Sequence, residues 1–160
     1  MIHIVPVLSD ETLSQARDLF REYATIPGVA PCVEDFGKEV AALPGCYAPP
    51  SGRLLLAVQE ISGNPAEPVG CGALRMFDQD TCEMKRVFVR PEFRGLGAGR
   101  ELVVELISEA RSIGYQKMLL DTLPTMKEAH NLYRTFGFRE ISCYQKAPIP
   151  GALFFELALR

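Results

Sequence analysis

The chain has 160 residues, of which 48% are hydrophobic and 23% are charged. These values are ordinary for a globular protein, so we expect residues 1–160 to form one domain rather than a disordered or repetitive chain. With 17 basic and 20 acidic residues the net charge is −3, and the chain lacks the positive field that non-specific nucleic-acid binding needs.

The cysteine pattern indicates neither a disulfide framework nor a zinc site. The five cysteines, at positions 32, 46, 71, 82 and 143, form no CxxC pair and are odd in number. We therefore expect reduced thiols in the core or in loops, and no bound metal. Because no apolar run reaches the length that spans a membrane, we expect a cytoplasmic protein with no membrane partner.

The first third of the chain predicts a strand, helices and a loop-rich stretch. His3 to Val7 is short, apolar and β-branched, as in a strand. Ser9 and Asp10 offer N-cap oxygens for a helix that we expect to end before Pro27. From position 27 to 52 the chain holds five of its twelve prolines, with one short helical pattern at 35–43.

Three strands are predicted next, at Leu54–Glu60, Val69–Phe77 and Cys82–Val89, and their short turns indicate an antiparallel meander. After a glycine-rich segment the apolar residues recur at helical spacing, up to Gly114. The remaining pattern predicts a strand at 117–122, a helix at 126–135, and strands at 139–144 and 152–159.

The glycine-rich segment sets a strand, a turn and a helix N-terminus in direct succession. Gly95, Gly97 and Gly99 allow backbone N–H groups to approach a ligand, and the helix end adds partial positive charge, so we predict a pyrophosphate site. A P-loop is excluded because Arg100-Glu101 follows Gly99 in place of the required GK[ST] ending. A Rossmann fingerprint fails because it needs glycine at position 100 or 102.

Two motifs carry a resemblance to a known family. Arg94-x-x-Gly97-x-Gly99 resembles the [QR]xxGx[GA] pyrophosphate loop of the GNAT superfamily of acetyl-CoA-dependent N-acyltransferases, and Ala129–Phe138 is similar to its AxxLYxxxGF segment. The likeness spans nearly the whole chain and is closest to a group of small bacterial members with no assigned substrate. It implies an α/β fold: a mixed, mostly antiparallel sheet of six to seven strands, with helices on both faces and a split between the fourth and fifth strands.

The resemblance also implies how acetyl-CoA is held. In the family the pantetheine arm lies along the fourth strand like an added strand, which maps to Val87 and Val89. The pyrophosphate contacts then come from Arg94, Gly95, Leu96, Gly97, Ala98, Gly99 and Arg100. Met126 stands where many relatives carry an asparagine near the cofactor, and Asn131 on the same helix is the candidate that compensates for this departure.

Two residues are candidates for proton transfer, because acetyl transfer removes a proton from the amine and supplies one to the thiolate. Glu83 lies 11 residues before Arg94, the offset at which some family members carry a catalytic glutamate. An ordinary strand carboxylate paired with Lys85 explains Glu83 equally well. Tyr133 occupies the family's tyrosine position and is the candidate donor, with a core tyrosine on a helix face as the alternative.

Other polar residues fit structural roles better. We expect His130 to be a surface or partly packed residue, and Asp121 to cap a strand end. Arg75 either lines the acceptor pocket or is a solvated strand residue. Cys71 and Cys82 read as small core hydrophobes rather than as nucleophiles.

The leading function is acetyl transfer from acetyl-CoA to a primary amine of a small molecule or peptide, by direct attack in a ternary complex. A non-catalytic acyl-CoA-binding sensor is the alternative. We expect the acceptor to bind between residues 26–52 and 144–151, where Glu34, Asp35 and Glu39 either attract a cationic amine or form a solvated helix face. Because members of the family that it resembles are frequently dimers, a homodimer is one of the states we consider for this chain.

Overall fold

The structure is a computed structural model. It describes residues 1–29 and 33–160, except for the side chains of residues 33 and 34. Its elements run in the predicted order: β1 (Ile2–Pro6), α1 (Asp10–Tyr23), α2 (Val33–Ala42), β2 (Arg53–Gln59), β3 (Glu67–Met76), β4 (Thr81–Val89), α3 (Ala98–Ile113), β5 (Lys117–Thr122), α4 (Lys127–Thr135), β6 (Arg139–Ile141) and β7 (Leu153–Ala158). Short 3₁₀ turns stand at Gly45–Tyr47 and Pro91–Phe93.

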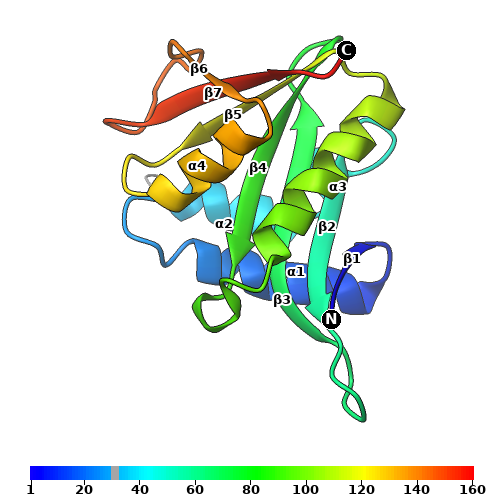
Figure 1. The fold of residues 1–160 in the computed structure, drawn as a ribbon. Helices are drawn as coiled ribbons and strands as arrows, with labels where there is room; N and C mark the ends of the chain where they lie inside the picture. Colours follow the sequence, from blue (N-terminus) through cyan, green and yellow to red (C-terminus); the bar gives the residue numbers. More distant parts are fainter. Residues whose placement is uncertain (30–32) are drawn as a thin grey trace.

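The strands form one seven-stranded sheet in the order β1-β2-β3-β4-β5-β7-β6 (Figure 1). The predicted β2–β3–β4 meander is present, and β4 and β5 are the parallel pair among otherwise antiparallel neighbours. This is the mixed, mostly antiparallel sheet that the sequence led us to expect.

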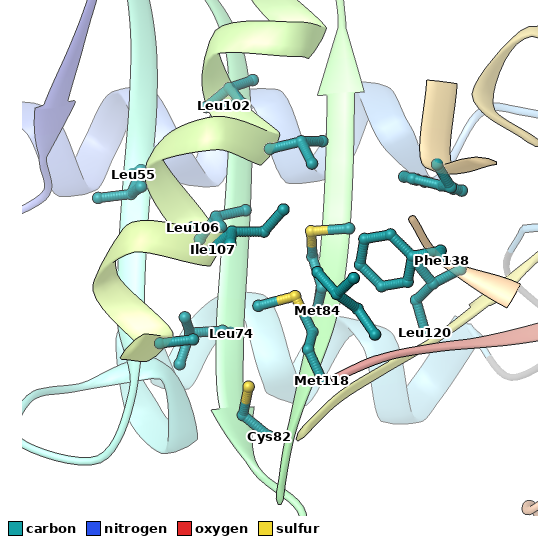
Figure 2. Packing of buried hydrophobic residues seen from close by; sticks show 14 of the residues in the cluster. Leu55, Leu74, Cys82, Met84, Leu102, Leu106, Ile107, Met118, Leu120 and Phe138 are labelled. Atoms are coloured by element: carbon teal, nitrogen blue, oxygen red, sulfur yellow. The ribbon is translucent and has the colours of Figure 1, made fainter. Parts of the chain in front are cut away.

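Helices cover both faces of this sheet. Helices α3 and α4 lie on one face and α1 and α2 on the other (Figure 1). On the first face, Leu102 and Leu106 of α3 pack toward Leu55, Leu74 and the methionines of the central strands (Figure 2). On the second face a separate core joins α1 and α2 to the opposite side of β2 and β3, with Leu19 and Phe20 fully buried.

Most predicted boundaries are shifted by one or two residues in the structure, and the strand after α4 differs most. The helix expected at 35–43 is α2, Val33–Ala42. The strand expected at 139–144 ends at Ile141. The chain leaves the sheet there because the ring of Tyr144 packs between Phe77 and Phe154, at centroid distances of 5.4 and 5.2 Å, on the α1–α2 side.

The cysteines with described side chains behave as expected. Cys71 and Cys82 are buried, and Cys46 and Cys143 are exposed. Burial raises the pKa of the Cys82 thiol to about 12, which keeps it in the unreactive thiol form. Cys32 lies outside the described residues. No helix of the described part of the chain is long and apolar enough to cross a membrane.

One buried tyrosine leads to a stability prediction with an unusual sign. Tyr47 is 1% exposed, and within the described residues its hydroxyl is the buried side-chain polar atom that lacks a hydrogen-bond partner. An unsatisfied buried hydroxyl costs free energy, so Tyr47→Phe is expected to raise the free energy of unfolding by about 1 kcal/mol. Urea unfolding measures this change.

Tyr115→Phe is the matched control for this prediction. The Tyr115 side chain is also buried, but its hydroxyl donates a 2.7 Å hydrogen bond to the carbonyl of Ser51. Its loss should lower the free energy of unfolding by about 1 kcal/mol. Equal destabilisation by the two substitutions would contradict the prediction for Tyr47.

Candidate active site

A cleft opens in the sheet where β4 and β5 part. The two strands pair only from Thr81 to Glu83, opposite Lys117 to Leu119. Beyond these three pairs the strands diverge, and a cleft lies between them. It is lined by Met126 and Tyr133 on the α3–α4 side and by Tyr23 of α1 on the other, so it passes through the sheet. The expected split between the fourth and fifth strands is therefore present.

The glycine-rich loop lies between β4 and α3. Gly97 has φ of 90°, a conformation that strains any residue with a side chain, and a Cβ there would meet nothing within 4 Å. The N–H groups from Gly95 to Arg100 make no hydrogen bond to the described residues. A row of free N–H donors at a helix N-terminus suits an anion such as a pyrophosphate.

The side chains around this loop fit the same ligand. Arg94, Leu96 and Arg100 are exposed, whereas Ala98 is buried and contributes only its backbone. The Arg94 guanidinium donates to the carbonyl of Val89 at 3.1 Å. The Arg100 guanidinium lies 4.9 Å from the ring centre of Phe136, so both cations are already held close to the loop.

Val87 and Val89 present their backbone groups to the cleft. The Arg90 N–H bonds the carbonyl of Val69 in β3, so the groups of Val89 point to the opposite edge of β4. Residues two apart point to the same edge, which places the groups of Val87 there too. This edge has no strand partner past Glu83, so, apart from the Val89 carbonyl that Arg94 bonds, it is available to an extended ligand.

A β-bulge interrupts β4 inside the cleft. Lys85 pairs with Ala73 and Phe88 with Cys71, so two residues of β4 face Gly72 of β3. Arg86 takes up the extra residue with φ of 61°, a left-handed conformation that costs a non-glycine residue about 1 to 2 kcal/mol.

A second pocket adjoins the cleft on the α1–α2 side and is strongly charged. It is lined by Asp35 and Glu39 of α2, by Lys85 and Arg86 of β4, by Asp121 of β5 and by part of the β6–β7 loop. Glu39 receives two hydrogen bonds from Arg86, at 2.9 and 3.0 Å. Lys85 bonds Asp121 at 3.0 Å across the open split.

The Lys85 contact sets the charge of Asp121. Burial by itself would raise the pKa of Asp121, but the Lys85 ammonium outweighs it and holds that pKa below its usual value. Asp121 therefore stays ionised at neutral pH and lines both the cleft and the pocket. The expectation that it merely caps a strand end missed this position.

Glu83 lies in an ion-pair network rather than on the cleft wall. Its side chain is 2% exposed, and Oε1 accepts two hydrogen bonds from Arg75, at 3.0 and 2.9 Å. Oε2 accepts a 2.6 Å hydrogen bond from the Tyr144 hydroxyl, with the Lys85 ammonium 3.8 Å away. Because neither the cleft nor the pocket is lined by Glu83, a base role needs an intermediary.

Tyr133 lies in the position of a core tyrosine and also faces the cleft. Its ring is 7% exposed and packs against Phe138 and Phe155, with centroids 5.7 and 6.2 Å apart, yet it also lines the cleft. No described residue hydrogen-bonds its hydroxyl. Burial raises the pKa of the phenol, so it carries its proton throughout the physiological range.

Two other residues of α4 do not line the cleft. Asn131 is exposed and stands two positions from Tyr133, about 200° around the helix, so the structure does not bring it beside that tyrosine. Its proposed cofactor contact stays a prediction. His130 is buried rather than at the surface, and its Nε2 lies 2.9 Å from the carbonyl of Leu123, which fixes the loop before α4.

The ranges expected to bind the acceptor, with Asp35 and Glu39, do line the charged pocket, but the part played there by Lys85, Arg86 and Asp121 was not predicted from the sequence. Arg86 and Tyr144 gave no local signal, because a left-handed arginine and a contact 61 residues away leave no mark in the pattern. The one available hint was the adjacent Lys85-Arg86 pair in a strand that also carries Glu83. Arg75 was expected either to line the acceptor pocket or to be a solvated strand residue. In the structure it bonds Glu83 and does not line the pocket.

Comparison with known proteins agrees with this geometry. Residues 14–138 match the acetyltransferase (GNAT) family. An uncharacterised N-acetyltransferase of Schizosaccharomyces pombe is 36% identical over 99% of this chain and 95% of its own length. The resemblance thus extends beyond bacterial members.

Solved structures share the fold at low sequence identity. A GNAT-family acetyltransferase of Staphylococcus aureus covers the whole of both chains with a TM-score of 0.81 at 20% identity. An acetyltransferase from Salmonella typhimurium, solved with acetyl-CoA as its cofactor, has a TM-score of 0.71 at 20% identity and covers 99% of this chain and 94% of that one.

A sheet split at its parallel pair, with a glycine loop at the start of the following helix, defines an acyl-CoA-dependent transferase. The chain belongs to the GNAT family and is an N-acetyltransferase.

Proposed function

We propose that this N-acetyltransferase, acting as one domain over residues 1–160, moves the acetyl group of acetyl-CoA directly to a primary amine in a ternary complex. The observation that supports this most is that the cleft passes through the sheet. It is lined by Tyr133 on the α3–α4 side, where the glycine loop begins α3, and it adjoins the charged pocket on the α1–α2 side. Donor and acceptor can then approach the same point from opposite faces, which suits direct transfer.

The residues have separate tasks in this proposal. The N–H groups of Gly95 to Arg100, with Arg94 and Arg100, bind the pyrophosphate, and the edge of β4 at Val87 and Val89 orients the pantetheine. Acetyl-CoA supplies an activated thioester. A backbone N–H of β4 near the bulge polarises the carbonyl oxygen.

Proton movement completes the transfer. The amine nitrogen bonds to the carbonyl carbon, the carbon–sulfur bond breaks, one proton leaves the nitrogen and one reaches the sulfur. We assign the second proton to the Tyr133 phenol, which faces the cleft in its protonated form. The first passes toward Glu83 through water and the Tyr144 hydroxyl, because Tyr144, like Glu83, lines neither the cleft nor the pocket.

Thiol release from acetyl-CoA in the presence of pooled amines tests the enzymatic function. Amine-dependent release, with an acetylated product of matching mass, is the expected result. A sensor module would bind acetyl-CoA without releasing thiol to any amine, and that outcome would overturn the proposal.

The glycine loop gives a binding prediction. Acetyl-CoA at about 100 times its dissociation constant should stabilise the fold by roughly 2.7 kcal/mol, which raises the melting temperature by several degrees. Gly97→Glu places a carboxylate where we expect phosphate and should abolish this shift. Differential scanning fluorimetry measures it.

Gly63→Glu is the control for strain. Gly63 has φ of 85° with open space around its Cβ, like Gly97, but it lies in the β2–β3 turn. The same left-handed strain and the same charge should leave the acetyl-CoA shift intact there. A Gly97→Glu protein that keeps the shift would remove the loop from the binding site.

A further inference from the structure

The charged pocket on the α1–α2 side carries information about the acceptor. It presents two cations and three carboxylates within one small space, together with the amide of Gln145. Both cations are largely buried: the side chain of Lys85 is 10% exposed and that of Arg86 is 18% exposed. Buried charges of both signs favour a ligand that itself carries both signs.

The bulge is what brings the two cations to the same pocket. In a regular strand Lys85 and Arg86 would point to opposite faces of the sheet. Before the bulge the even-numbered residue Met84 packs in the α3 core, whereas after it Val87 packs there and Phe88 joins the α1 core. The left-handed residue reverses the alternation, so Arg86 follows Lys85 onto the α1–α2 face.

The Arg86 side chain is fixed in a defined orientation. Its guanidinium carbon lies 5.1 Å from the ring centre of Phe36 and 5.7 Å from that of Tyr23. Glu39 accepts one hydrogen bond from Nε and one from Nη2, so Nη1 and the second hydrogen of Nη2 form a fork that takes no part in this ion pair. A guanidinium has five N–H donors whose fork geometry matches a carboxylate.

We propose that the acceptor is an α-amino acid, or a similarly short amino carboxylate, whose carboxylate binds the Nη1 side of Arg86. The inference rests on the proposed acetyl transfer at the β4–β5 cleft. Arg86 and Asp121 line both the charged pocket and the cleft. A carboxylate held by Arg86 therefore places an amine two bonds from the carboxylate carbon in the same space, with Asp121 as its counter-charge.

Other amines fit this pocket less well. A polyamine or a lysine side chain would bring a second cation or an apolar chain against Lys85 and Arg86. A peptide N-terminus would place an uncharged amide where the carboxylate belongs. The transfer itself needs no further reactant, because the acceptor carboxylate is unchanged while the amine exchanges a proton for the acetyl group.

The experiment compares matched acceptors with the intact protein. Thiol release is measured with acetyl-CoA and each of the common α-amino acids, with the corresponding α-carboxamides, and with putrescine and spermidine. At least one amino acid should exceed its carboxamide by about a hundredfold in kcat/KM, as expected for a bidentate carboxylate contact. The carboxamide amine is the less basic of the two, so this preference would run against intrinsic availability.

Arg86→Lys keeps the charge and removes the fork. It should raise KM for the preferred amino acid by about tenfold or more and leave KM for its carboxamide within about twofold. The matched control is Arg53→Lys, because Arg53 forms a comparably buried 2.7 Å ion pair with Glu109 away from the cleft. It should change neither value.

The outcomes separate the two levels of the proposal. Carboxamides or polyamines acetylated as well as the amino acids, or an Arg86→Lys effect equal on acid and amide, would overturn the amino acid assignment and leave acetyl transfer standing. No thiol release with any amine would overturn the transfer function and, with it, the acceptor assignment. If Arg86→Lys fails to fold, the acceptor comparison in the parent protein decides alone.

Discussion

Tyr133→Phe should lower turnover by about a hundredfold to ten-thousandfold, roughly 2.7 to 5.4 kcal/mol of barrier, the range typical of general acid catalysis. The substitution deletes one oxygen from a ring that packs against Phe138 and Phe155, so the fold should be kept. Acetyl-CoA affinity should change little. Steady-state kinetics and the acetyl-CoA melting shift measure the two effects separately.

The pH profile and the leaving group add sharper readouts. Because burial raises the pKa of Tyr133, the phenol keeps its proton well above pH 10, and turnover should show no alkaline fall from this group below that pH. Acyl donors with more acidic thiols should partly rescue the Phe variant. Equal losses in affinity and turnover, without rescue, would make Tyr133 a packing residue.

Glu83→Gln should lower turnover by about a hundredfold, as expected for the loss of a general base. The shape of the side chain is kept, and only the charge is lost. Because Glu83 is buried and reaches the substrates through another group, Tyr144→Phe should reproduce most of this loss. Adding Tyr144→Phe to Glu83→Gln should then cost less than about threefold more, as expected for residues that act as a unit.

The alternatives give different patterns. A large loss for Glu83→Gln with a normal Tyr144→Phe enzyme would make Glu83 the direct base. Turnover within about threefold of the parent in both variants would reduce the network to an ion pair with Arg75, visible only in stability. Kinetics of the two single variants and the double variant distinguish these cases.

Local patterns predicted most of the fold. The helical spacing after Gly99 and the short turns of the meander are properties of neighbouring residues, so the sequence states them directly. The glycine loop was predictable for the same reason, since its function lies in its own backbone. The strand expected to reach Tyr144 was too long because Phe77 and Phe154, both distant in sequence, hold that ring.

The charged pocket required the three-dimensional structure. Sequence alternation places Arg86 on the α3 side of the sheet, and the bulge that moves it is set by tertiary packing against Gly72. A side chain at Gly72 would meet Leu106 at 3.0 Å, so the close approach of α3 depends on that glycine. Similarly, the spacing of Glu83 and Lys85 indicated a local pair, whereas the stronger partners come from β3 and the β6–β7 loop.

The short parallel pairing of β4 and β5 divides the sheet into two parts that share few paired residues. One part consists of β1 to β4 and the other of β5, β7 and β6. Three residue pairs, from Thr81 to Glu83 of β4, join the two parts. Two residues past the last pair, Lys85 of β4 bonds Asp121 of β5 at 3.0 Å and bridges the two parts. Because Lys85 and Asp121 line both the cleft and the charged pocket, the two binding regions share one ion pair.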